Sequence, residues 1–137
     1  MTATEPSRGA AFAVVAAGGA IGALSRWGVD VFADSRGLPM ASATLTVNIV
    51  GCLLMGLLVS YVLAHPARHG LWRPFLGVGV LGGFTTFSAF AVDVVLLTRD
   101  GNALVALGYL VASVGGSLLA AWAGIAVGQA LRRRSAP

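Results

Sequence analysis

Four long apolar segments dominate this chain, and each is long enough to cross a lipid bilayer. They occupy residues 10–33, 41–64, 71–98 and 101–131. A hydrocarbon core about 30 Å thick needs roughly 20 helical residues, because each residue adds about 1.5 Å. Within a bilayer the backbone must satisfy its own hydrogen bonds, which a helix does inside one segment. The pattern therefore predicts an all-α integral membrane protein with four transmembrane helices in a single domain.

The segments are joined by short connections that contain helix-breaking residues. These are SRGLP at 35–39, HPARHG at 65–70 and RDGN at 99–102. The ends of the chain, residues 1–8 and 132–137, are predicted to be flexible tails. The first segment has the shape of a signal peptide, but three similar segments follow it, so we expect it to be retained. With 57% hydrophobic and 10% charged residues, the chain carries too much apolar surface for a soluble domain.

The positive charges indicate orientation in a cell membrane rather than nucleic-acid binding. The chain has nine arginines and no lysine, mostly in loops and tails. The side shared by both tails carries Arg8, Arg68, Arg73 and Arg132 to Arg134. The other side carries Arg36 and Arg99, with Arg26 near its boundary. This bias favours a multi-pass protein with both tails in the cytoplasm.

The fourth segment presents two lines of residues at helical spacing. Small residues recur every four positions: Gly108, Ala112, Gly116, Ala120, Gly124 and Gly128. Such a stripe lets membrane helices approach closely, and we interpret it as a packing face. Beside it lie the hydroxyls of Tyr109, Ser113 and Ser117, which can either hydrogen-bond between helices or serve a polar solute. The pattern alone favours packing for these hydroxyls, and also for the single Cys52.

Two polar side chains within the first two segments need partners at membrane depth. Asn48 either bonds to another helix or faces a solute path. Arg26 either reaches the lipid headgroups or attracts anions into a vestibule. Asp30, four residues further on, can pair with Arg26 locally.

The third segment contains a stretch, GVLGGFTTFSAF at 79–90, that is unusual for a membrane helix. Its glycines weaken the helix, and an interruption frees backbone groups that only protein, water or an ion can satisfy at this depth. Phe84, Phe87 and Phe90 are spaced by three, and the positive edges of such rings can contact an anion. The sequence predicts a third helix broken near 82–87, with an ion close to the break.

No combination of residues indicates an enzyme. His65 and His69 lie in a loop with a proline and an arginine between them, so their spacing does not imply a helical metal site. No carboxylate pair, Ser/His/Asp set, P-loop or dinucleotide fingerprint is present. We therefore expect a protein that performs no covalent chemistry.

Three motifs together resemble the CrcB/Fluc family of fluoride channels. They are GGAIGALSRW at 18–27, TLTVNIVG at 44–51 and GVLGGFTTFSAF at 79–90, in the order found in that family. The resemblance covers essentially the whole chain. It implies a fluoride-specific ion channel that exports fluoride passively and lowers its cytoplasmic toxicity. It also implies an antiparallel dimer in the lipid bilayer, formed by two identical subunits or by a paired paralogue.

The resemblance also assigns roles to individual residues. It implies a structural sodium ion held by the backbone carbonyls of Gly82 and Thr85. The residues implied for the fluoride pathway are Asn48, Phe87, Phe90, Tyr109, Ser113 and Ser117. Arg26 matches the motif arginine, with a vestibule or structural role. The chain departs from the family pattern at four positions, with Ala89 for threonine, Ala91 for serine, Asp93 for glutamate and Trp27 for tyrosine. The hydroxyl groups missing from the third helix are expected to affect the conduction rate more than the selectivity.

Two other functions stay open from the sequence. A small four-helix multidrug exporter would need a membrane-embedded carboxylate in the first helix, and residues 10–25 contain none. A non-transporting membrane assembly subunit would explain the small-residue stripes but not the broken third helix.

Overall fold

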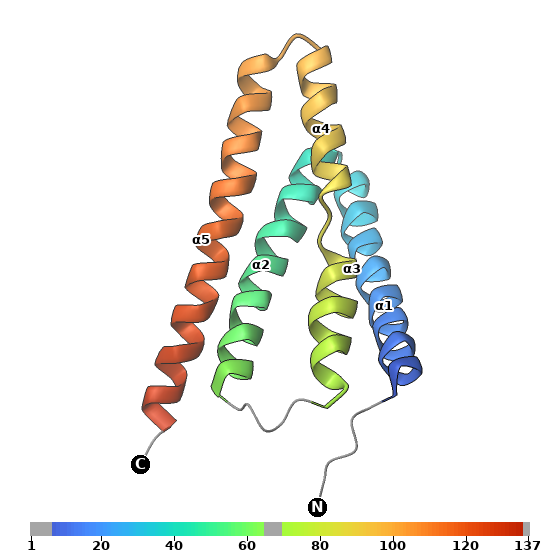
Figure 1. The fold of residues 1–137 in the computed structure, drawn as a ribbon. Coiled ribbons are helices and arrows are strands. Elements are labelled where there is room, and N and C mark those ends of the chain that lie inside the picture. Colours follow the sequence, from blue (N-terminus) through green and yellow to red (C-terminus); the bar gives the residue numbers. More distant parts are fainter. Residues whose placement is uncertain (1–6, 65–69, 136–137) are drawn as a thin grey trace, which may run out of the picture.

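The computed structural model describes residues 7–64 and 70–135 of the chain, which form a helical bundle (Figure 1). Its elements are α1 (Arg8–Ser35), α2 (Met40–Ala64), the π-helix η1 (Pro74–Leu81), α3 (Gly82–Phe84), α4 (Ser88–Arg99) and α5 (Ala103–Ser135). The described residues include no strand. Four spans are long and apolar enough to cross a membrane: Arg8–Ser35, Met40–Ala64, Pro74–Arg99 and Ala103–Arg133. The predicted all-α, multi-pass membrane fold is therefore confirmed.

The ends of the bundle differ from the predicted tails. Residues 132–135 were expected in a flexible tail, but they continue α5 as helix. Arg8 was also expected in a tail, yet it begins α1, where the Ser7 hydroxyl accepts a hydrogen bond from the amide of Ala10 at 3.2 Å. The rest of both tails, and the loop histidines at 65 and 69, lie outside the described residues.

Glycine ends the helix at the two turns that the structure describes. Gly37, after α1, and Gly101, after α4, have φ angles of 63° and 78°, which favour glycine over other residues. At each turn, the amides of the glycine and of the next residue donate to carbonyls in the last helical turn. This pair of bonds closes a helix and lets the chain reverse. As a result α1 begins and α5 ends at the same end of the bundle (Figure 1).

The small-residue stripe of α5 packs against α2 over only part of its length. A methyl group added at Gly124 would collide with the α2 backbone, and one added at Gly56 of α2 would collide with the backbone of Ala121. Gly128 likewise lies against an α2 side chain. At Gly108, near the start of α5, a methyl group would meet nothing within 4 Å. The predicted packing face is therefore confirmed for the second half of α5 and not for its start.

The remaining helices are arranged around the pair formed by α2 and α5. α1 packs mainly against η1 and α3. Its glycines Gly18 and Gly22 allow this, because a methyl group at either would collide with the backbone of η1 or α3. α4 and the start of α5 form a hairpin that extends past the α1–α2 turn (Figure 1). No residue of α4 is buried within the chain.

The third span is interrupted at residues 85–87, which lie outside any helix. Thr85 has extended backbone angles (φ −77°, ψ 156°), and α4 begins at Ser88. Gly82 was expected in the break but has helical angles (φ −66°, ψ −34°). The neighbouring Gly83 has a packing role, because a methyl group there would collide with the α1 backbone. The glycine-rich part of the motif is thus helical, and the interruption follows it.

Candidate functional site

Asn48 on α2 is joined to Thr86 in the interruption by two hydrogen bonds. The backbone amide of Thr86 donates to Oδ1 of Asn48 at 2.9 Å, and Nδ2 of Asn48 donates to the carbonyl of Thr86 at 2.8 Å. In a continuous helix the Thr86 amide would bond to the carbonyl four residues earlier, that of Gly82. The Asn48 side chain replaces that helical bond and leaves the Gly82 carbonyl without its regular partner.

A groove of about 330 Å³ lies beside the interruption, between α2, α4 and α5. It brings together five of the six residues that the family resemblance assigned to the fluoride pathway: Asn48, Phe87, Phe90, Ser113 and Ser117. The other lining residues are Cys52, Thr85, Thr86, Val114 and Leu118. The lining contains amide, hydroxyl, thiol and aromatic groups but no charged side chain. We call this cavity the Asn48 groove.

The two phenylalanines form one wall of the Asn48 groove. Phe87 directly precedes α4 and is 79% exposed, while Phe90 lies in the first turn of α4 and is half-buried. Their ring centroids are 5.8 Å apart, with the planes inclined at 51°. Because the rings are tilted, they do not stack face to face, and ring edges stay available. Those edges carry partial positive charge and can contact an anion.

The three hydroxyls that were predicted to share one line have different surroundings. Ser113 is only 5% exposed, and its hydroxyl oxygen is buried. Ser117 is half-buried, and both serines line the Asn48 groove. Tyr109 does not line it; its hydroxyl donates to Oδ2 of Asp93 at 3.0 Å, and its ring centroid lies 5.6 Å from that of Phe90. Tyr109 therefore packs against the Phe90 ring and does not itself line the groove.

A second cavity, of about 290 Å³, lies between the second half of α1, the first turns of α2 and the first half of α4. Arg26 lines it, with Nη1 4.0 Å from Oδ2 of Asp30, so the predicted local pair is present. The Nε atom of Arg26 is buried and has no hydrogen-bond partner in the described part of the chain. Thr86 lines both this cavity and the Asn48 groove. Arg26 thus lies in a cavity that adjoins the groove and that the carboxylates of Asp30 and Asp93 also line.

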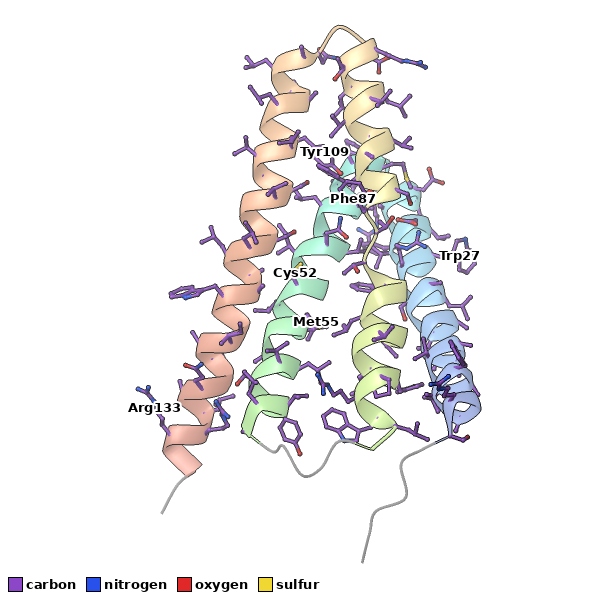
Figure 2. All side chains as sticks on the ribbon, in the orientation of Figure 1. Trp27, Cys52, Met55, Phe87, Tyr109 and Arg133 are labelled. Atoms are coloured by element: carbon purple, nitrogen blue, oxygen red, sulfur yellow. The ribbon has the colours of Figure 1, made fainter. Side chains whose placement is uncertain are left out.

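The departures from the family pattern lie away from the Asn48 groove. Ala89 and Asp93 line the second cavity instead. Ala91, in α4, is half-buried. Trp27 is 64% exposed and points away from the bundle (Figure 2).

The carbonyls of Gly82 and Thr85, which the resemblance assigned to sodium, flank the end of α3. The Gly82 carbonyl lacks its regular helical donor, and Thr85 is extended, so its carbonyl is not part of a helical ladder. Unwound backbone carbonyls are suitable ligands for sodium. No group of three His, Cys, Asp or Glu side chains that could hold a metal occurs among residues 7–64 and 70–135. The residues at this position thus fit a sodium ion held by backbone oxygens.

Sequence reasoning assigned no pathway role to Cys52 or Asp93, although spacing could have found both. Cys52 follows Asn48 by four residues, and Asp93 follows Phe90 by three, so each shares a helix face with a predicted site residue. Figure 2 shows Cys52 on α2, below the level of Phe87 and Tyr109. The pairing of Asn48 with the Thr86 backbone had no comparable signal, because the partner is a main-chain group.

Comparison with known proteins identifies the family of this chain. The family described as CrcB-like protein, Camphor Resistance (CrcB), matches residues 13–125. A protein of Paracoccus denitrificans (strain Pd 1222) named Fluoride-specific ion channel FluC is 50% identical over 122 residues, 88% of this chain and 95% of the relative. A protein of the same name from Rhizobium meliloti (strain 1021) is 41% identical over 119 residues, 86% of this chain and 95% of the relative.

A third protein of that name, from Pseudomonas fluorescens (strain SBW25), is 43% identical over 114 residues, which is 82% of this chain and 92% of the relative. The matches extend over all four spans and include the interruption and both cavities. Since the family match covers most of the sequence and similar proteins align with it nearly end to end, this chain belongs to the CrcB family.

Proposed function

We propose that this protein is a fluoride-specific ion channel that passively exports fluoride and so lowers its cytoplasmic concentration and toxicity. The observation that carries the proposal is the Asn48 groove, in which an amide, two serine hydroxyls and two phenylalanine rings meet beside an interrupted helix. Relatives that align with nearly the whole chain are named fluoride-specific ion channels. These relatives give no support to a multidrug exporter or an assembly subunit.

The groove has the chemistry that a small, strongly hydrated anion requires. A selective path must replace the water around the ion, yet bind the ion weakly enough to release it. Asn48 uses one of its two side-chain N–H donors for the Thr86 carbonyl, and the hydroxyl-bearing residues Ser113 and Ser117 also line the groove. Because no charged side chain lines the groove, an anion is held by dipoles and ring edges only. A negative cell interior then drives fluoride outward without covalent chemistry.

The proposed channel includes a second subunit, packed antiparallel to the first. In a single chain the non-helical residues 85–87 lie beside an open groove, and Phe87 is 79% exposed. Non-helical backbone at membrane depth is tolerated only where protein or water covers it. A second copy, or a paired paralogue, placed over the interruption would provide that cover and close the open side of the path.

A structural sodium ion at the carbonyls of Gly82 and Thr85 completes the proposal. It is supported by the Gly82 carbonyl, whose regular helical donor bonds to Asn48 instead, and by the extended backbone of Thr85. When bound, the ion would supply a fixed positive charge that neutralises carbonyl dipoles at the interruption and joins the two subunits there.

Fluoride efflux from liposomes that contain the purified protein, measured with a fluoride electrode, tests the function. We expect efflux with fluoride and none with chloride. Replacement Phe87→Ile removes a ring edge worth about 1 kcal/mol, so efflux should fall about fivefold or more while the protein stays folded. Phe12→Ile is the matched control, because Phe12 is similarly exposed (75%) but lies on α1, outside the groove.

Two results would contradict these statements separately. A folded protein with no efflux beyond that of empty liposomes would exclude the channel function. Efflux that is unchanged by Phe87→Ile would exclude Phe87 from the pathway but leave the function standing.

A further inference from the structure

We propose that Asp93 is a positioning residue for the anion path, which holds the Phe90 ring in the wall of the Asn48 groove by fixing Tyr109. The inference rests on the proposed channel function. Asp93 lines the second cavity and not the groove, so it acts on the path through other side chains.

Tyr109 on α5 is held to α4 by two contacts. Its hydroxyl donates to Oδ2 of Asp93 at 3.0 Å, and its ring centroid lies 5.6 Å from that of Phe90, with the ring planes inclined at 37°. Asp93 follows Phe90 by three residues, so both lie on the same face of α4 and reach Tyr109 together. The Tyr109 side chain is therefore fixed at its hydroxyl by one residue and packed along its ring by the other.

Within one subunit, Phe90 lies between a buried aromatic ring and an exposed one. Tyr109 is only 9% exposed, whereas Phe87, whose ring centroid is 5.8 Å from that of Phe90, is 79% exposed. A ring in close-packed surroundings has little freedom, while an exposed ring changes rotamer readily. The orientation of Phe90, and of the ring edge that it offers to an anion, thus depends mainly on Tyr109.

The carboxylate of Asp93 determines where the Tyr109 proton points. A carboxylate oxygen accepts hydrogen bonds, and the hydroxyl of Tyr109 has a single proton to donate. The side chains of Thr44 and Ser113 also interact with this hydroxyl, but a serine or threonine hydroxyl can either donate or accept, so neither fixes the direction of the bond. Asp93 is therefore the group that anchors the Tyr109 hydroxyl in one orientation.

A direct electrostatic role for Asp93 makes a different prediction. Asp93 lines the second cavity together with Arg26 and Asp30, where a negative charge would repel an anion. Removal of the charge alone would then raise efflux, whether or not the hydrogen bond to Tyr109 were kept. In the positioning role the hydrogen bond matters and the charge does not.

Fluoride efflux from liposomes separates these roles. Asp93→Ala removes the acceptor, and Tyr109→Phe removes the donor but keeps the ring, so we expect each to lower efflux about fivefold or more. The double variant should be no slower than either single one, because both changes break the same bond. Asp93→Asn keeps an acceptor oxygen without the charge and should recover most of the rate. Asp100→Ala is the control, because Asp100 is an exposed carboxylate just after α4, outside both cavities.

A fluorine NMR spectrum reports on Phe90 without any need for conduction. The protein is labelled with 4-fluorophenylalanine, and the signal of residue 90 is assigned by its loss in Phe90→Leu. We expect this signal to shift or broaden in Asp93→Ala and to stay in place in Asp93→Asn. The signal of Phe12, which lies on α1, should be the same in all of these proteins.

Several results would overturn the inference. Efflux through Asp93→Asn that exceeds the wild-type rate, or that falls as low as in Asp93→Ala, would exclude a role carried by the hydrogen bond. A double variant with multiplied losses would exclude a shared bond, and an unchanged Phe90 signal in Asp93→Ala would exclude an effect on the ring. Absence of efflux from the wild-type protein would instead contradict the proposed function, and the fluorine signals would still decide whether Asp93 positions Phe90.

Discussion

At the residue scale, Asn48 fixes the backbone of the interruption and also supplies a donor to the groove. Replacement Asn48→Asp turns the donor that faces the Thr86 carbonyl into an acceptor, so one bond is lost and two oxygens oppose each other. We expect the free energy of unfolding to drop by about 1–3 kcal/mol and fluoride efflux to fall about tenfold to a hundredfold. Thermal unfolding in detergent and liposome efflux measure the two effects.

Thr46→Val is the control for this substitution. Thr46 lies two residues from Asn48, but its hydroxyl donates within its own helix, to the Ser42 carbonyl at 2.7 Å. Stability and efflux should both stay near wild type. If Asn48→Asp were as stable as the wild-type protein, the two bonds to Thr86 would not be what holds the interruption.

The residue scale is also where the sequence was least informative about the site. The spacing of Phe87 and Phe90 indicated a shared wall, and both rings do line one groove. The equal spacing of Tyr109, Ser113 and Ser117 indicated one line, yet Tyr109 lies outside the groove and bonds to Asp93. Helical spacing defines a shared face, but which part of that face meets a cavity depends on neighbouring helices.

At the scale of the elements, the second half of α5 depends on close approach to α2. Gly124→Ala adds a methyl group that collides with the α2 backbone, which cannot move as a side chain end can. We expect it to lower the free energy of unfolding by about 1–3 kcal/mol. Gly108→Ala belongs to the same stripe but meets nothing within 4 Å, so its stability should match the wild type.

Unfolding of both variants in a detergent titration, followed by tryptophan fluorescence, provides the comparison. Equal stability of the two would mean that α5 does not need its glycines to pack. The stripe itself was visible in the sequence because the spacing alone reveals a face of small residues. Where that face meets a partner was not visible, since it depends on where α2 ends relative to α5.

The location of the interruption shows a second limit of sequence reasoning about elements. The glycines of the third span indicated a break from Gly82, but Gly79 and Gly83 serve close packing against α1. The non-helical residues begin at Thr85, beside the position where Asn48 captures a backbone amide. That hydrogen bond joins residues 38 positions apart in the sequence, so no local sequence pattern predicts it.

At the scale of the whole molecule, the thickness of the bilayer sets the length that each span needs, so the number of spans can be predicted from the sequence. Four apolar segments of sufficient length predict four spans, because a helix satisfies its backbone hydrogen bonds within one segment. The arginine bias towards one side and the antiparallel pairing are properties of the assembled protein in its membrane, and both remain predictions.

Removal of sodium tests the proposed assembly. We expect the protein in detergent with sodium to have the molar mass of a dimer, measured by light scattering. Exchange of sodium for a large organic cation should shift it towards monomer, because the carbonyls of Gly82 and Thr85 would lose their shared ion. A monomer in both buffers would contradict the dimer, and a dimer indifferent to sodium would contradict the ion site.

The π-helix η1 has a consequence for residues that lie outside it. A π-helical turn holds more residues than an α-helical one, and each residue of an α-helix advances about 100° around the axis. The eight residues Pro74–Leu81 therefore set the angular phase of everything that follows in the third span. Loss of a single residue there would leave Phe87 and Phe90 unchanged in identity but rotate both away from the groove. A segment without any pathway residue thus determines the direction in which the pathway rings point.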